Sequence, residues 1–551
     1  MATRSAVFGD LSRSSLLASV TPTVVASFLG TVLVVAVAVY LPARTNVLFN
    51  TPDETANHLF TKKFAETGKL WYTTDYTSLD EENLLHPRGV LTHEGREVLY
   101  QYPTLPLVYG TLYRVVGENV KYIGAVFALA TLFFLYRTAK LLYGAPYWQI
   151  VALFLGFTPL LFQFSRPYMA AGASLTFFAG GCWLLTRYVL ESRRTDLALA
   201  TGMFVAGMLF RYEFIFFSSL LVVSALWYKH HARLTSTRLW LDLSLYGALV
   251  AGLFLGPVLL VNTIVYGDPL TYGYKIFNSV YLPDRGAQEG ASLIENAWRR
   301  AQEVLLPQGT FDVQLLLRNL TRFTFALMPA LSTLALLGAV VAVRRSGIQW
   351  RYIVPFALSI VYLLIYMAGG DTWNATTKFA TFDASFVRYW LPVGMLLVIF
   401  AGYALRHFHD PAVQWTLAIV VAVYGVTSVI TLTHGSLSDV DQAIANYETW
   451  SQEVIVANTE EDAIVFTGLV DKGIVPYRGV AAWWGGTYNR DAAARSMARV
   501  FYADHPVYVY KERSFSILDL NRGLARYDLH AIETDGPALF KVVKFDHSSD
   551  R

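Results

Sequence analysis

Two adjacent carboxylates and a nearby histidine are the residues of this sequence best suited to chemistry. Asp53, Glu54 and His58 lie in the run TPDETANH at residues 51–58, shortly after the first long apolar segment. One carboxylate could take the proton of an attacking hydroxyl. The other, with or without His58, could orient the acceptor or bind a divalent cation such as Mg²⁺, Mn²⁺ or Ca²⁺. Neighbouring acids also raise each other's pKa, which suits a general base near neutral pH.

The acidic pair also fits a purely structural role. Thr51 or Asp53 would cap a helix that begins near Glu54, because acids in a first turn are stabilised by the helix dipole. Capping accounts for Asp53 but gives no role to His58, one turn later. Carboxylates at a membrane surface are costly unless they bind something. We therefore interpret Asp53 and Glu54 as catalytic candidates, and these two with His58 as candidate metal ligands.

The composition indicates an integral membrane protein. Of the 551 residues, 54% are hydrophobic and 15% are charged, and the mean hydropathy is +0.39. Soluble chains carry about 25% charged residues. The net charge of +3 and the lack of a Lys- and Arg-rich stripe argue against a nucleic-acid partner. Cys182, the single cysteine, lies in an apolar segment and cannot form an internal disulfide.

Eleven apolar segments have the length of membrane helices. We predict spans at residues 21–42, 120–142, 147–164, 170–190, 197–211, 213–228, 243–266, 322–343, 352–369, 387–405 and 413–433. The stretch 197–228 is divided in two at Arg211-Tyr212-Glu213. With that break, every short loop on one side is basic, which places residues 1–20 in the cytoplasm and the loops 43–119 and 267–321 outside.

The composition changes near residue 436. Strand-like segments at 463–466, 507–510 and 539–543 alternate there with helical patterns such as 491–502. This order predicts a small extracytoplasmic α/β domain over residues 436–551, after a membrane domain over residues 21–435. In the first outer loop, amphipathic patterns at 60–70 and 102–116 predict helices, the second of them in the membrane interface.

Further motifs follow the acidic run on the predicted outer side. They are HPR at 86–88, YPTLP at 102–106, SRPYM at 165–169, NTIVYGDPLTYGY at 262–274 and FVRYWLP at 386–392. Their order resembles the GT-C superfamily of lipid-linked-sugar glycosyltransferases, and within it family 39, which includes protein O-mannosyltransferases and the aminoarabinose transferase of lipid A. The resemblance covers residues 20–435 and implies a polytopic α-helical membrane protein with a GT-C-like fold.

The chain departs from this family at one position. Many relatives have an acid shortly after the Arg-Pro element, where this chain has Ala170-Ala171-Gly172-Ala173. A second acidic ligand is therefore absent or comes from elsewhere, for example from Glu213 or Asp371. This departure bears directly on whether the protein uses a metal ion.

The resemblance also implies how a donor would be held. In this superfamily basic residues hold a polyprenyl phosphate, and the candidates at outer helix ends are Arg166, Arg211, Lys275 and Arg388. Alternatively these side chains snorkel to lipid headgroups, or Arg211 pairs with Glu213. The matched motifs further imply an acceptor or sugar pocket formed by His58, His86, Arg88, Tyr168, Tyr274 and Tyr389.

The function implied is an inverting hexosyl- or pentosyltransferase. It would move a sugar from a polyprenyl phosphate, such as dolichyl phosphate, to a hydroxyl of a protein, glycan or lipid on the outer face of a bacterial or archaeal plasma membrane, with Asp53 as base. A divalent cation is the one cofactor considered. A secondary transporter would instead have polar groups near the bilayer midplane. A membrane scaffold would tolerate substitution of Asp53, Glu54 and Arg388.

Overall fold

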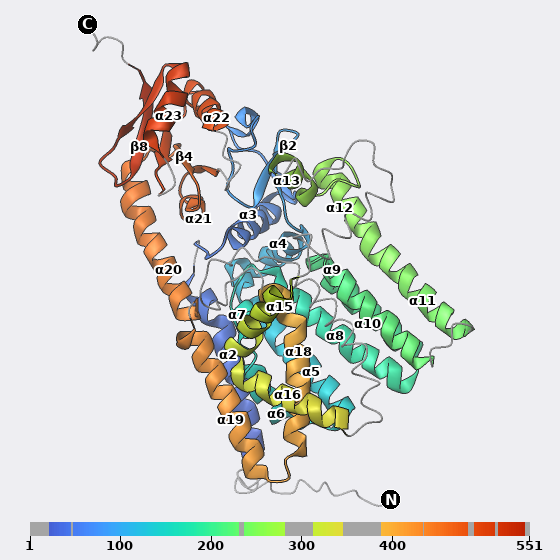
Figure 1. Ribbon diagram of the computed structural model, residues 1–551. Coiled ribbons are helices and arrows are strands. Elements are labelled where there is room, and N and C mark those ends of the chain that lie inside the picture. Colours follow the sequence, from blue (N-terminus) through green and yellow to red (C-terminus); the bar gives the residue numbers. More distant parts are fainter. Residues whose placement is uncertain are drawn as a thin grey trace, which may run out of the picture.

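The computed structural model describes residues 21–45, 48–230, 236–281, 312–344, 387–433, 435–482, 490–512 and 516–545. Apolar helices form one end of the molecule and a five-stranded sheet forms the other, with α3 (Pro52–Thr67) and α4 (Thr104–Val116) between them (Figure 1). The predicted acidic site therefore lies at the junction of the two parts.

Ten of the eleven predicted spans fall on helices. These helices are α2 (Pro22–Arg44), α5 (Ile123–Tyr143), α6 (Tyr147–Leu155) with α7 (Thr158–Phe164), α8 (Ala170–Glu191), α9 (Arg194–Phe210), α10 (Phe214–Lys229), α11 (Thr237–Val250) with α12 (Gly256–Tyr266), α16 (Pro329–Arg344), α18 (Val387–His407) and α19 (Pro411–Thr427). The break between α9 and α10 occurs at residues 211–213, as predicted. The span predicted at 352–369 lies outside the described residues.

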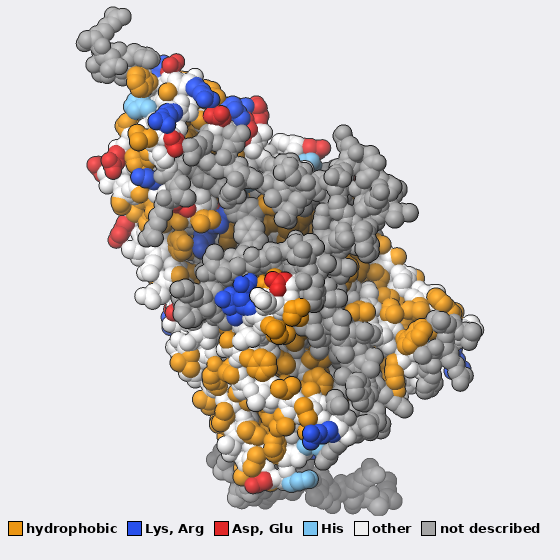
Figure 2. All heavy atoms as spheres, in the orientation of Figure 1, with side chains coloured by type: hydrophobic (Ala, Val, Ile, Leu, Met, Phe, Trp, Pro, Cys, Tyr) orange, Lys and Arg blue, Asp and Glu red, His pale blue; other side chains and the backbone are white. Residues whose placement is uncertain are grey.

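Five helices among the described residues are long and apolar enough to cross a membrane, or seven if each of two bent pairs is one span. The five are Pro22–Arg44, Thr104–Tyr143, Thr237–Tyr266, Val387–His407 and Pro411–Asn458, and the pairs are α6 with α7, bent by 81°, and Val313–Ala326 with Pro329–Ala342, bent by 107°. Apolar side chains cover much of the helical part in Figure 2, whereas charged ones gather over the sheet. The chain is thus a multi-pass membrane protein, and the number eleven stays a prediction.

The membrane helices approach one another closely where glycines face large side chains. A Cβ on Gly394 of α18 would lie 1.9 Å from the ring of Phe157, and one on Gly425 of α19 would lie 2.2 Å from the carbonyl oxygen of Leu155. Small residues allow such contacts in membranes, where helices associate by packing rather than by the hydrophobic effect. These contacts hold the late helices α18 and α19 against the early helices α6 and α7.

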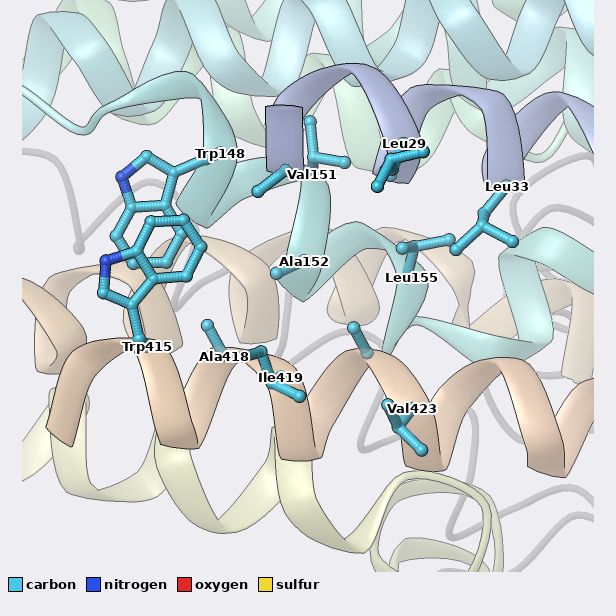
Figure 3. A pocket seen from close by; sticks show the side chains of 13 residues that line it. Leu29, Leu33, Trp148, Val151, Ala152, Leu155, Trp415, Ala418, Ile419 and Val423 are labelled. Carbon is cyan, nitrogen blue, oxygen red and sulfur yellow. The ribbon is translucent and has the colours of Figure 1, made fainter. Parts of the chain in front are cut away.

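An apolar cavity of about 180 Å³ lies between α2, α6 and α19 (Figure 3). At one end the rings of Trp148 and Trp415 stack with their centroids 3.9 Å apart. All of the side chains that line it are apolar: Ala26, Leu29, Gly30, Leu33, Trp148, Val151, Ala152, Leu155, Trp415, Ala418, Ile419, Ala422 and Val423. It contains no group for acid–base or nucleophilic chemistry, so it is no candidate for an active site.

The first outer loop has a regular structure of its own. Thr51 caps α3 by accepting a hydrogen bond from the backbone N–H of Glu54 at 3.4 Å, and Gly68, with φ 73°, ends the helix. Three strands follow in the order β1-β3-β2, all antiparallel: β1 (Trp71–Tyr72), β2 (Val90–His93) and β3 (Arg96–Leu99). This small sheet was not predicted, because its strands are two to four residues long.

The second outer loop contributes two described helices, α13 (Gly273–Tyr281) and α15 (Val313–Leu320). A Cβ on Gly273 would lie 2.3 Å from the backbone oxygen of Tyr100, and the rings of Tyr100 and Tyr274 are in edge contact at 5.2 Å. The start of α13 therefore packs on the segment that joins β3 to α4. This contact brings the second outer loop to the candidate site.

The C-terminal part contains α20 (Leu437–Trp450) and a mixed sheet with the strand order β5-β4-β6-β8-β7. Strand β4 pairs in parallel with β5 and β6, whereas β8 pairs antiparallel with β6 and β7. The elements are β4 (Ile464–Thr467), α21 (Asp471–Ile474), β5 (Gly479–Ala482), α22 (Arg490–Tyr502), β6 (Val507–Tyr510), α23 (Ile517–Leu524), β7 (Leu529–Glu533) and β8 (Leu539–Lys544). The three predicted strands fall on β4, β6 and β8. The domain boundary at 436 and the outer location stay predictions.

Helix α21 connects this sheet to the first outer loop. The backbone N–H and the Nε of Arg88 each donate to the carboxylate of Asp471 at 2.8 Å, and Asp471 is 1% exposed. Next to it, the Nζ of Lys472 donates to the backbone oxygen of Asn50 at 2.6 Å. Burial and the nearby Arg88 lower the pKa of Lys472 to about 8. Because Asn50 precedes the cap of α3, the C-terminal part helps to fix the start of this helix.

We predict that Asp471→Asn loosens this connection. The substitution removes the negative partner of Arg88, and breaking a buried ion pair costs about 3 kcal/mol of unfolding free energy. Thermal unfolding of the detergent-solubilised protein should show a melting temperature several degrees lower. The control is Asp491→Asn, whose partner Arg526 is exposed, and it should change little. Equal melting temperatures for the two variants would contradict this role of Asp471.

Candidate active site

A cavity of about 50 Å³ lies at the start of α3. It is lined by Asp53, Asn57, Gln101, Tyr102, Met169, Ala170, Ala171, Arg211, Glu213, Tyr274, Arg388 and Tyr389. These residues come from α3, from the segment before α4, from the start of α8, from the break between α9 and α10, and from α13 and α18. The fold thus brings six distant parts of the chain to one small polar cavity.

Asp53 forms an ion pair with Arg388 across this cavity. The Nη1 of Arg388 donates to Oδ2 of Asp53 at 2.8 Å, and the two side chains are about one fifth exposed, at 20% and 18%. Burial raises the pKa of Asp53, but Arg388, then Arg166, and a hydrogen bond from Gln101 lower it, and the net result lies below its usual value. The expectation that Glu54 raises the pKa of Asp53 is therefore wrong, because the two acids have separate cationic partners.

A second ion pair lines the same cavity. The Nε of Arg211 donates to Oε1 of Glu213 at 2.7 Å, and the hydroxyl of Tyr102 donates to Oε2 at 2.9 Å. The guanidinium of Arg211 also lies 4.9 Å from the ring centre of Tyr389. Glu213 thus supplies a second acid to the cavity that holds Asp53, one of the two sources considered from the sequence. The other source, Asp371, lies outside the described residues.

Glu54 points away from the cavity into a buried ion pair. The Nη2 of Arg166 donates to Oε2 of Glu54 at 2.5 Å and to the hydroxyl of Thr51 at 2.7 Å. The side chains of Arg166 and Glu54 are 2% and 3% exposed, and neither lines the cavity. This pair therefore holds the first turn of α3 in place, and the charge of Arg166 lowers the pKa of Asp53.

His58 is separated from both acids by its surroundings. Its ring lies between the rings of Phe49, at 4.9 Å, and Tyr168, at 4.8 Å, and its Nε2 is 3.9 Å from the carboxylate of Glu118. Burial lowers the pKa of His58, so the imidazole is neutral at pH 7. The ring of His58 is therefore packed between two aromatic side chains and is not open to a metal ion.

The predicted metal triad does not fit a cation. Asp53 pairs with Arg388, Glu54 pairs with Arg166, and His58 faces Glu118, so the three ligands do not converge. Within the described ranges, no three His, Cys, Asp or Glu side chains form a group that could hold a metal ion. We therefore assign no chemical step to a metal ion bound by this triad.

The other sequence-predicted residues divide into two groups. Arg211, Tyr274, Arg388 and Tyr389 line the cavity with Asp53. The other five residues do not line it. Among these five, His86 has its Nε2 2.7 Å from Oδ1 of Asn83. The remaining four lie outside the cavity: Arg88 at the contact with Asp471, Arg166 beneath α3, Tyr168 packed on His58, and Lys275 on the exposed side of α13.

Six lining residues were not predicted as site residues from the sequence, and three of them are polar: Asn57, Gln101 and Tyr102. The other three are Met169, Ala170 and Ala171. Asn57 follows Asp53 by four residues, and on a helix this spacing places two side chains on one face. Tyr102 belongs to the YPTLP motif, which is part of the family resemblance but was not assigned to the pocket. The helical spacing could have identified Asn57, whereas no local pattern connects Gln101 to α3.

Comparisons with known proteins show the fold. No family model and no curated protein matches the sequence. Among solved structures, the archaeal oligosaccharyltransferase AglB from Archaeoglobus fulgidus, in complex with an inhibitory peptide and a dolichol-phosphate, is 10% identical, with a TM-score of 0.51 over 95% of this chain and 74% of that one. An apo Archaeoglobus fulgidus oligosaccharyltransferase is 8% identical, with a TM-score of 0.50 over 96% and 75%. The predicted GT-C fold is thus confirmed, whereas membership of family 39 stays a prediction.

We predict that Arg166→Met destabilises the protein, because it leaves the carboxylate of Glu54 buried without its cation. An uncompensated buried charge costs about 3–5 kcal/mol. The double variant with Glu54→Gln removes both charges and should recover part of that loss. Thermal unfolding of wild type, Glu54→Gln, Arg166→Met and the double variant measures the coupling. Additive losses would show that the two side chains do not interact.

Proposed function

We propose that this protein is a glycosyltransferase that moves a hexose or pentose from a polyprenyl-phosphate-linked donor to a hydroxyl of a protein, glycan or lipid. The reaction takes place at the extracytoplasmic face of the plasma membrane of a bacterium or archaeon, with inversion at the anomeric carbon. One observation carries the proposal: Asp53, Arg211, Glu213 and Arg388 line a single cavity in a chain with the fold of membrane oligosaccharyltransferases.

The donor phosphate binds to Arg211 and Arg388. Arg211 and Arg388 line the cavity, whereas Arg166 and Lys275 do not. Arginine suits this task because its planar fork binds two phosphate oxygens at once. The lipid tail stays in the bilayer beside α18, which begins at Val387, next to Arg388. An AglB structure of the same fold contains a dolichol-phosphate, which supports a polyprenyl phosphate as the donor class.

Asp53 acts as the base. The acceptor oxygen attacks C1 of the sugar on the face opposite the phosphate, the bond from C1 to the phosphate oxygen breaks, and its electron pair leaves with the phosphate. The hydroxyl proton passes to the carboxylate of Asp53, and this single displacement inverts C1. In the empty cavity Arg388 holds the pKa of Asp53 low. When Arg388 turns towards the phosphate, Asp53 becomes a stronger base at the moment it is needed.

We predict that Asp53→Asn abolishes transfer. The amide cannot take the proton, and loss of a positioned base lowers rates by about 10²–10⁴-fold. The assay measures transfer of radiolabelled sugar from polyprenyl-phosphate donors to a membrane extract by purified protein in lipid. Asp491→Asn is the matched control and should retain wild-type activity.

Wild-type activity in a folded Asp53→Asn variant would remove Asp53 from this role. No transfer by correctly folded wild-type protein would favour the membrane scaffold instead. A parallel assay with a chelator tests whether transfer requires a divalent cation. Loss of transfer that Mg²⁺, Mn²⁺ or Ca²⁺ restores would show that a cation takes part through ligands other than the predicted triad.

We further predict that Arg388→Gln moves the acid limb of the pH–rate profile. With Arg388 present, the pKa of Asp53 lies below its usual value, so the carboxylate stays ionised throughout the physiological range. Without the guanidinium, burial is opposed mainly by Arg166, and the pKa of Asp53 rises. Residual transfer should therefore decline at a higher pH than in wild type. The control Lys275→Gln, an exposed cation, should keep the wild-type limb, and a shared profile would contradict the proposed pairing.

A further inference from the structure

Of the two polar atoms in the side-chain amide of Asn57, only one has a hydrogen-bond partner among the described residues. Its Nδ2 donates to the backbone oxygen of Tyr168 at 3.0 Å, and the residue is 3% exposed. Its Oδ1 is fully buried and has no hydrogen-bond partner in the part of the chain that the structure describes. Nearly all buried polar atoms in proteins have a partner, so this atom requires an explanation.

The hydrogen bond to Tyr168 identifies which amide atom is free. Only the nitrogen can donate to a backbone carbonyl, so this contact assigns Nδ2 to Tyr168 and leaves Oδ1 as the free atom. Oδ1 has lone pairs and no proton. A group that meets it must therefore be a hydrogen-bond donor, and a phosphate oxygen would be repelled.

Arg211, which lines the same cavity, has a hydrogen-bond donor without a partner among the described residues. Its Nε donates to Glu213 at 2.7 Å, yet Nη1 is buried and has no partner among the described residues. Asn57 and Arg211 both line the cavity of about 50 Å³ that also contains Asp53. Two residues that line one cavity therefore each have a buried polar atom without a partner among the described residues, a neutral acceptor on Asn57 and a cationic donor on Arg211. A ligand that satisfies both needs a donor hydrogen and an acceptor oxygen, and a phosphorylated sugar supplies a hydroxyl hydrogen and an anionic oxygen.

The position of Asn57 on α3 places it beside the reaction. It follows Asp53 by four residues, so the two side chains lie one turn apart on one helix face. We propose that Asn57 is a specificity-determining residue, and that its Oδ1 accepts a hydrogen bond from one hydroxyl of the donor sugar whose phosphate is bound by Arg211. This inference deepens the proposed function and depends on it.

The alternative is that Oδ1 holds only a water molecule. The cavity has room for water, and a water molecule bound there would donate a hydrogen bond to Oδ1 without any contact between Asn57 and the sugar. The two cases differ in selectivity. A site built to bind a hydroxyl discriminates strongly against the analogue that lacks it, because its own polar atom is then left unpaired. A bound water makes no such distinction among hydroxyls.

The test uses decaprenyl-phosphate-linked mannose, glucose, galactose and arabinose, and then the monodeoxy analogues of the sugar that is transferred. We expect wild type to lose about 10-fold or more in kcat/KM with one deoxy donor and little with the others. Asn57→Ala should lower kcat/KM for the full sugar and abolish the preference over that one analogue. Asn57→Leu, which fills the space of the amide, provides the same comparison if the alanine variant does not fold.

Thr61→Ala is the matched control. Thr61 lies on the same helix, is buried, and has an Oγ1 with no partner among the described residues, but it does not line the cavity. This variant should keep the wild-type preference. An equal fall for all donors in Asn57→Ala, or an unchanged preference, would overturn the role of Asn57. Failure of wild type to transfer any of the sugars would instead overturn the proposed function.

Discussion

The ion pair between Asp53 and Arg388 is the constraint on which the site depends. It joins residues 335 positions apart, the first turn of α3 and the first turn of α18. Each charge is largely removed from water, and a buried charge is tolerated only beside a partner. The outer loop and the late membrane helix must therefore meet at one place. The glycines of α18 and α19 that pack against the early helices allow this approach.

The site contains its own counter-charges. Asp53 with Arg388 and Glu213 with Arg211 make the cavity neutral, and Glu54 with Arg166 adds a third neutral pair beneath it. An anionic ligand must therefore compete for guanidinium groups that carboxylates already hold. In the proposed reaction, that competition would couple donor binding to the basicity of Asp53, since Arg388 cannot fully pair with both the phosphate and the carboxylate. Asn57 and Arg211, which both line this cavity, each have one polar atom without a hydrogen-bond partner among the described residues.

The C-terminal part belongs to the same arrangement. Asp471 holds Arg88, and Lys472 holds the backbone just before Thr51, so α21 contacts the chain on both sides of α3. The sheet therefore contributes to the position of Asp53 without lining the cavity. Arg88 lies in a motif that the sequence assigned to the acceptor pocket, yet the structure places it in this contact.

The sequence by itself determined the features that depend on local patterns. Ten of the spans predicted from hydropathy fall on helices, the break at residues 211–213 was found from its charges, and Thr51 caps α3 as its residue type predicts. Only the tertiary structure decided which charges pair. Glu54 pairs with Arg166 and His58 faces Glu118, so the expected metal triad does not form. Arg388, and then Arg166, lower the pKa of Asp53, whereas an adjacent acid was expected to raise it. The reason is physical: hydropathy and capping act within a few residues, whereas the partner of a buried charge is set by how helices far apart in the chain pack together.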